Sequence, residues 1–147
     1  MSDHPMALIY GGTPHRFPML LVDSVEELSE GLGRALKQVS ANEVLLERFG
    51  DAPPTLPSCL LVDALGQVAI LLLRERDGGA ASVWYLGGIE AMTFHTAIPA
   101  GSVLRMEARV LKRWRTTARI EVKAWIGAVP VADGFMVLSQ RGSGSNE

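Results

Sequence analysis

Cysteine and histidine are both scarce in this sequence, and this limits the chemistry available to its own side chains. It has one cysteine, Cys59, and three histidines, His4, His15 and His95. A lone cysteine cannot form a disulfide within the chain and is most simply a buried cytosolic thiol. The sequence also has no metal-ligand spacing, glycine-rich phosphate loop or dinucleotide fingerprint. We therefore expect neither a metal nor an organic cofactor.

The sequence likewise lacks a charge excess and a long hydrophobic run. Its net charge is −2, so we expect no nucleic-acid partner and no membrane partner. The most hydrophobic window, residues 59–73, is too short to cross a bilayer and includes Asp63 and Gln67. Asp3 stands where a signal peptide would carry cations, and no apolar run follows it directly. These features favour a cytoplasmic protein.

One long helix is expected from Ser58 to Arg76. This segment contains no proline and a single glycine, Gly66, and its apolar residues fall on nearly every face. A helix that is apolar all round is typical of one buried on most sides. Pro57 and Ser58 fit its start, with Ser58 as the expected N-cap.

After Gly79 the hydrophobic period changes to two, which predicts antiparallel strands with one face on the core. The alternating segments are 104–111, 118–126 and 131–138, and an earlier strand is expected at 32–39. One buried helix followed by such strands indicates an α+β domain whose antiparallel sheet curls around the helix. We expect a single domain at 1–141, and a disordered tail at 142–147, which is rich in glycine and serine.

Three sequence blocks occur in an order and spacing found in one protein family. They are Thr13-Pro14-His15-Arg16-Phe17-Pro18-Met19-Leu20-Leu21-Val22-Asp23-Ser24, Lys37-Gln38-Val39-Ser40-Ala41-Asn42-Glu43 and Leu56-Pro57-Ser58-Cys59-Leu60-Leu61-Val62-Asp63-Ala64-Leu65-Gly66-Gln67. In these blocks the chain resembles the bacterial 3-hydroxyacyl-acyl-carrier-protein dehydratases, small hotdog-fold enzymes of type II fatty-acid synthesis. The resemblance covers nearly the whole chain. It implies a hotdog fold in which two protomers form one continuous sheet, with acyl-thioester sites at the dimer interface.

The resemblance also implies how the chemistry is divided. Dehydration of a 3-hydroxyacyl thioester needs a base beside the carbonyl, an acid for the departing hydroxyl and a dipole that polarises the carbonyl. In the family, a histidine is the base, an acidic residue on the neighbouring protomer's central helix is the acid, and that helix's N-terminus binds the carbonyl. Asp63 occupies the acid position, and Ser58, Cys59 and Gln67 are expected to contact the substrate. The alternative for Asp63 is a paired structural acid.

The chain departs from the family at the base. Phe49 stands fourteen residues before Asp63, at the position of the histidine, and phenylalanine cannot accept a proton. No histidine lies between His15 and Asp63. A branch associated with aryl-polyene-type clusters looks similar and departs at the same position, so we expect an incomplete site. Ser58, where the family usually has glycine, either narrows the approach to the helix amides or caps the helix.

The remaining histidines and the basic residues have plainer interpretations. We expect His15 to pack beside Pro14 and Pro18. We expect His95 to lie at the surface, near the mouth of the acyl tunnel that the resemblance implies. The alternative for either histidine is a catalytic role that replaces the missing base. Several basic residues would suit docking of an acidic carrier protein, or form an ordinary solvated strand face. They are Arg105, Arg109, Lys112, Arg113, Arg115, Arg119 and Lys123.

We therefore expect a dehydratase-like protein that acts on or binds thioesters of acyl carrier protein or coenzyme A. It would serve fatty-acid or polyketide/aryl-polyene-type biosynthesis. It would form a homodimer, or a heteromer with another hotdog subunit whose histidine completes the site. A non-catalytic acyl-thioester-binding protein is the alternative. An acyl thioesterase is the third choice, because the first block matches the dehydratases better.

Overall fold

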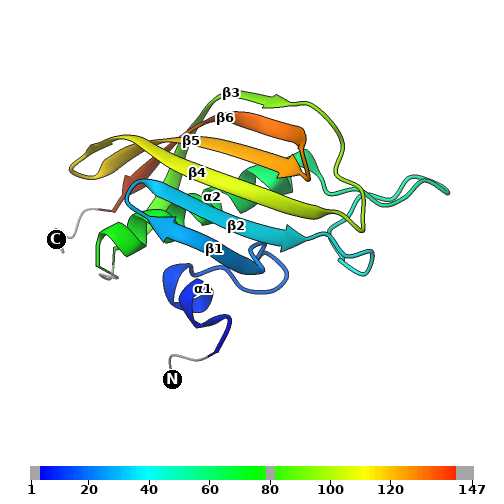
Figure 1. The fold of residues 1–147 in the computed structure, drawn as a ribbon, viewed down its shortest axis with the longest axis horizontal. Helices are drawn as coiled ribbons and strands as arrows, with labels where there is room; N and C mark the ends of the chain where they lie inside the picture. The colour runs from blue at the N-terminus through cyan, green and yellow to red at the C-terminus, as the bar shows by residue number, and fades with distance from the viewer. Residues whose placement is uncertain (1–3, 79–81, 142–147) are drawn as a thin grey trace, which may run out of the picture.

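An antiparallel sheet wraps around one long helix in the computed structural model, which describes residues 4–78 and 82–141 (Figure 1). The tail expected at 142–147 lies outside the described residues. The elements are α1 (Ala7–Gly12), β1 (Ser24–Ser29), β2 (Leu32–Gln38), α2 (Ser58–Arg76), β3 (Trp84–Phe94), β4 (Val103–Trp114), β5 (Thr117–Ile126) and β6 (Val129–Gln140). The predicted α+β hotdog architecture is confirmed.

The six strands form one sheet in the order β1-β2-β4-β5-β6-β3, with every neighbouring pair antiparallel. The predicted alternation is confirmed in β4 and β5, where Met106 and Ile120 are fully buried while Arg105 and Arg119 point outward. The β4–β5 turn is tight, because the two strands continue to pair as far as Trp114 and Thr117.

Helix α2 begins and ends where the sequence predicts. Leu61 and every residue from 64 to 73 are buried, because the helix packs against β2, β3, β4 and β5 on one side and α1 on another. Each fully buried leucine, such as Leu65 or Leu72, contributes about 1.5–3 kcal/mol relative to exposure. This burial fixes the helix in the sheet and so fixes the residues it carries.

Three elements were not predicted from the sequence: α1, β1 and β3. β3 lies at the edge of the sheet, and its residues do not alternate in burial. Its pairing with β6 is interrupted by two bulges, and Ala91 at the second bulge has a φ of 49°. Gly134 of β6 allows this close approach, since a Cβ there would lie 2.8 Å from the Cα of Met92. A period-two pattern could not form along such a strand.

No helix among the residues that the structure describes is long and apolar enough to cross a membrane.

Candidate active site

Asp63 lies in the second turn of α2, where the chain's N-terminal segment passes over the helix. Its neighbours Ala64 and Leu65 are fully buried. The side chain of Asp63 keeps 36% of its surface exposed. The predicted acid is therefore embedded in an apolar helix and still reachable from solvent.

Gln67, one turn further along α2, holds Asp63 in place. Its side chain is fully buried, and its Nε2 donates hydrogen bonds to Asp63 Oδ2 (2.9 Å) and to the carbonyl of Met19 (2.7 Å). Its Oε1 accepts the backbone N–H of Leu21 at 2.9 Å. The amide thus ties the N-terminal segment to the helix and orients Asp63. A direct contact between Gln67 and substrate stays a prediction.

The N-terminal segment brings His15 next to Asp63. The His15 Nε2 atom lies 4.0 Å from Asp63 Oδ2, and its Nδ1 atom lies 2.5 Å from the hydroxyl oxygen of Thr13. The His15 side chain is 24% exposed. The sequence predicts a structural role for this histidine and carries no signal for its contact with Asp63, because the contact depends on how a distant segment folds over α2.

The first turn of α2 presents free backbone amides. Leu60 and Leu61 donate their N–H groups to the carbonyl of Pro57. Within residues 4–78 and 82–141, no acceptor meets the N–H groups of Ser58 and Cys59. These two groups stand at the positive end of the helix dipole and can hydrogen-bond a carbonyl oxygen.

Two expectations about this turn are wrong. The N-cap is Pro57 rather than Ser58, which is the first helical residue, and no side-chain cap is found in the described part of the chain. The thiol of Cys59 is exposed, not buried, because the first turn of α2 extends beyond the sheet's apolar cover. Both side chains therefore border the free amides, as expected of residues that contact a substrate, although that contact stays a prediction.

A family model for the FabA-like domain matches residues 13–134. The chain belongs to this family. A 3-hydroxyacyl-[acyl-carrier-protein] dehydratase FabZ from Ruminiclostridium cellulolyticum is 36% identical over 122 residues, covering 82% of this chain and 86% of the relative. The predicted relationship to the 3-hydroxyacyl-acyl-carrier-protein dehydratases is confirmed.

Solved structures share the fold of this FabA-like chain. The dehydratase heterocomplex ApeI:P from Xenorhabdus doucetiae superposes with a TM-score of 0.80 at 20% identity, covering 92% of this chain and 91% of that one. A hypothetical thioesterase from Streptococcus pneumoniae, solved with coenzyme A, has a TM-score of 0.65 at 15% identity, covering 83% and 88%. One fold thus accommodates proteins of different named activities, so the chemistry must be argued from the site.

Phe49 stands at the tip of a loop that precedes α2 in this FabA-like chain. Glu47 and Thr55 close the loop through two backbone hydrogen bonds, and Phe49 is 70% exposed. The segment joining β2 to α2 reaches out from the body of the molecule (Figure 1). An exposed apolar ring on a projecting loop suits contact with another subunit better than it suits proton transfer.

His95 lies beside Asp133, whereas His15 lies beside Asp63. Its Nε2 lies 2.6 Å from Asp133 Oδ2 of β6, and both side chains are well exposed. The predicted surface position is confirmed. In the part of the chain that the structure describes, no three histidine, cysteine, aspartate or glutamate side chains gather closely enough to hold a metal ion.

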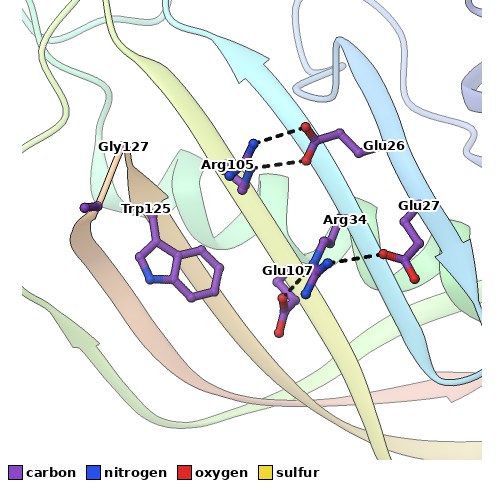
Figure 2. Close-up of a pocket in the computed structure, with 8 residues that line it drawn as sticks. Glu26, Glu27, Arg34, Arg105, Glu107, Trp125 and Gly127 are labelled. Atoms are coloured by element: carbon purple, nitrogen blue, oxygen red, sulfur yellow. Dashed lines mark hydrogen bonds and ion pairs between the residues drawn. The ribbon is translucent and has the colours of Figure 1, made fainter.

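A hollow lies on the sheet face opposite α2 (Figure 2), and Asp63 is not among the residues that line it. It has a volume of about 670 Å³. Arg34 pairs there with Glu107 at 3.0 Å and with Glu27 at 3.3 Å, and the hydrogen bond with Glu107 raises the pKa of Arg34. Arg105 pairs with Glu26 at 3.2 Å. Both guanidinium groups of the hollow are paired, and its carboxylates outnumber them by three to two, so it offers no free positive charge to an anionic ligand.

Similar ion pairs extend across most of the basic strand face. Arg109 pairs with Glu107, Arg119 with Glu90, and Lys123 with Glu121. Arg113 pairs with Asp77, and Lys112 lies over the ring of Trp114. These contacts favour an ordinary solvated strand face over a carrier-protein docking patch.

Proposed function

We propose that the chain is a dehydratase-like hotdog protein that acts on 3-hydroxyacyl thioesters of acyl carrier protein or coenzyme A. The pathway would be fatty-acid or polyketide/aryl-polyene-type biosynthesis. The observation that carries the proposal is the placement of Asp63, oriented by Gln67 and one helical turn from the free amides of Ser58 and Cys59. The same proposal puts the protein in the cytoplasm, where a thiol such as Cys59 stays reduced.

The geometry supports a definite role for each group. The N–H groups of Ser58 and Cys59 would bind the thioester oxygen and stabilise the charge that develops on it. Asp63 follows Cys59 by four residues, about 6 Å along the helix axis, which suits a hydroxyl on the substrate's third carbon. Asp63 would donate a proton to that hydroxyl as it leaves as water. Phe49 supplies no base.

We propose that a second hotdog subunit supplies the family-type base. The two edges of the sheet differ in a way that supports assembly. β1 carries Glu26 and Glu27, charges typical of an edge that stays unpaired. β3 instead exposes the apolar side chains of Tyr85, Leu86 and Ile89. Pairing through β3, in a homodimer or in a heteromer with a histidine-bearing subunit, would cover these side chains.

A non-catalytic acyl-thioester-binding protein is the second candidate, and the exposed phenylalanine at the base position favours it. A thioesterase, in which Asp63 would direct water, is the third candidate. Its support is the fold alone.

The test is the hydration of a crotonyl thioester by the purified chain, alone and with a cognate histidine-bearing hotdog subunit. We expect slow turnover alone and a large increase in the complex. Asp63→Asn should reduce hydration in the complex by about 10²-fold or more, since general acids contribute about 10² to 10⁴-fold. The variant should fold normally, because its side-chain oxygen can still accept the Gln67 hydrogen bond.

Other outcomes discriminate the candidates. Tight binding of the thioester without turnover under any pairing would support the binding protein. Release of free coenzyme A without hydration would support the thioesterase. An Asp63→Asn complex as active as the wild type contradicts the proposed role of Asp63.

A further inference from the structure

With Phe49 at the base position the chain lacks the family-type base, but the imidazole of His15 lies beside Asp63. His15 and Asp63 belong to the same chain, and their Nε2 and Oδ2 atoms are 4.0 Å apart. We propose that His15 is a general base of this chain's own, so that one protomer carries both an acid and a base. This inference rests on the proposed function and assigns it a further residue.

The separation of the two groups fits the reaction. In dehydration the base acts on the carbon next to the carbonyl, and the acid acts on the hydroxyl of the adjacent carbon. The side-chain atom that removes the proton and the side-chain atom that protonates the hydroxyl must therefore lie within a few ångströms of each other. His15 Nε2 and Asp63 Oδ2 meet this condition, and the two side chains are 24% and 36% exposed. A substrate bound at the first turn of α2 can reach both.

Thr13 prepares the histidine for this role. The threonine is 2% exposed, and its hydroxyl oxygen accepts the backbone N–H of His15 at 3.3 Å while lying 2.5 Å from the ring Nδ1. A proton on Nδ1 would be donated to this oxygen and would leave a lone pair on Nε2, the atom that faces Asp63. Arg16 steadies the same turn by donating to the carbonyls of Thr13 and His15.

The protons balance within the pair. His15 Nε2 takes the proton from the second carbon of the acyl group, and the electrons of that C–H bond form the new C=C bond. The C–O bond of the third carbon breaks, and the departing hydroxyl takes the proton of Asp63 and leaves as water. The imidazolium of His15 then returns its proton to the Asp63 carboxylate beside it. The products are the 2-enoyl thioester and water, and both side chains regain their starting state.

The proposal concerns the chain without a complete partner. A partner's histidine would add a second base, so His15 accounts for the slow turnover expected of the chain alone.

The experiment isolates the base step from dehydration. Butyryl-pantetheine, a saturated thioester without a 3-hydroxyl, is incubated in D₂O with the full chain alone, and deuterium entry at its second carbon is followed by mass spectrometry. We expect exchange above the buffer rate with the wild type. His15→Gln should lower it by about 10²-fold or more, the usual contribution of a general base. His95→Gln, which removes a histidine paired with Asp133, is the matched control and should leave exchange unchanged.

A second variant covers the case in which His15→Gln fails to fold. His15→Ala opens space beside Thr13, and added imidazole should restore part of the exchange, which loss of structure would not permit. Wild-type exchange at the buffer rate, or equal exchange in the wild type and a folded His15→Gln, overturns the inference. Neither result bears on the proposed function, because hydration with a histidine-bearing subunit and its loss in Asp63→Asn are measured separately.

Discussion

The side-chain amide of Gln67 is fully buried and hydrogen-bonds three residues: Asp63 on its own helix, and Met19 and Leu21 in the N-terminal segment. Because both amide hydrogens and the oxygen are used, the amide has one favourable orientation. The hydrogen bond from this amide orients the carboxylate of Asp63. The same side chain holds the N-terminal segment, which carries His15, against the helix. The candidate site therefore depends on a residue that a substrate need not touch.

Replacing this amide should damage both stability and activity. Gln67→Leu leaves the backbone N–H of Leu21 and the carbonyl of Met19 without partners, which costs about 1–3 kcal/mol in the free energy of unfolding. Urea denaturation measures this cost. Gln38→Leu is the control, because Gln38 is exposed and donates to Ser102 at 3.3 Å, so its loss should cost less than about 0.5 kcal/mol. Equal costs for the two variants would contradict a structural role for Gln67.

The sequence predicts the part of the site that lies on helix α2. Asp63 and Gln67 could be placed on one helix face because helical spacing is local. The His15–Asp63 contact could not be placed, since it depends on the path of a segment far away in the sequence. The exposure of Cys59 was also missed, because an apolar window does not reveal which of its turns extends beyond the sheet.

Among the elements, α2 is fixed at its C-terminal end by a single carboxylate. Asp77, the residue that follows the helix, accepts hydrogen bonds from Arg113 (2.5 Å), Ser82 (3.0 Å) and Trp84 (3.1 Å). Burial by itself raises the pKa of Asp77, but the hydrogen bonds from Arg113, Trp84 and Ser82 outweigh it and hold the pKa below its ordinary value. This carboxylate links the helix to β3 and β4.

The lowered pKa gives the Asp77 contribution a definite pH dependence. The carboxyl's pKa is lower in the folded than in the unfolded chain, so the stabilisation is present above the ordinary value of 3.8 and is lost as the pH falls through the folded value. Asp77→Asn should cost about 1.5–3 kcal/mol at pH 7 and progressively less below pH 3.8.

Urea denaturation at pH 7, 4 and 3 checks this difference. Asp51→Asn, which changes an exposed loop carboxylate, serves as the control and should change stability by less than about 0.5 kcal/mol at pH 7. An Asp77→Asn cost that stays constant down to pH 3 would show that the carboxylate charge contributes nothing.

Local pattern explains which elements the sequence predicts. The bounds of α2 and the alternation of β4 and β5 follow from residues that are neighbours along the chain. β3 could not be predicted, because an edge strand with two bulges exposes most of its residues on both faces. The exposed apolar residues of β3 can be interpreted only once the position of this strand at the edge of the sheet is known.

For the whole molecule, assembly through β3 is the proposal on which a shared site depends. Light scattering at micromolar concentration should give a mass of at least twice the 15.9 kDa of one chain. Ile89→Lys places a charge on the apolar edge strand and should shift the population toward monomer.

The control for this change is Leu111→Lys on β4, which is also exposed but lies inside the sheet, and it should leave the mass unchanged. A wild-type chain that is a well-folded monomer would count against both the assembly and a site at its interface.

The central claim is that Asp63 of one subunit works with a base carried by another, and complementation within this chain tests it most directly. The wild type has the acid and lacks the family-type base, whereas a double variant with Phe49→His and Asp63→Asn has the base and lacks the acid. The two proteins are unfolded, mixed, refolded together and assayed for hydration of a crotonyl thioester. We predict that the mixture exceeds the sum of the two proteins refolded separately, because mixed dimers contain one complete site. Turnover of the mixture equal to that sum, with mixed dimers demonstrated by mass spectrometry, would contradict the claim.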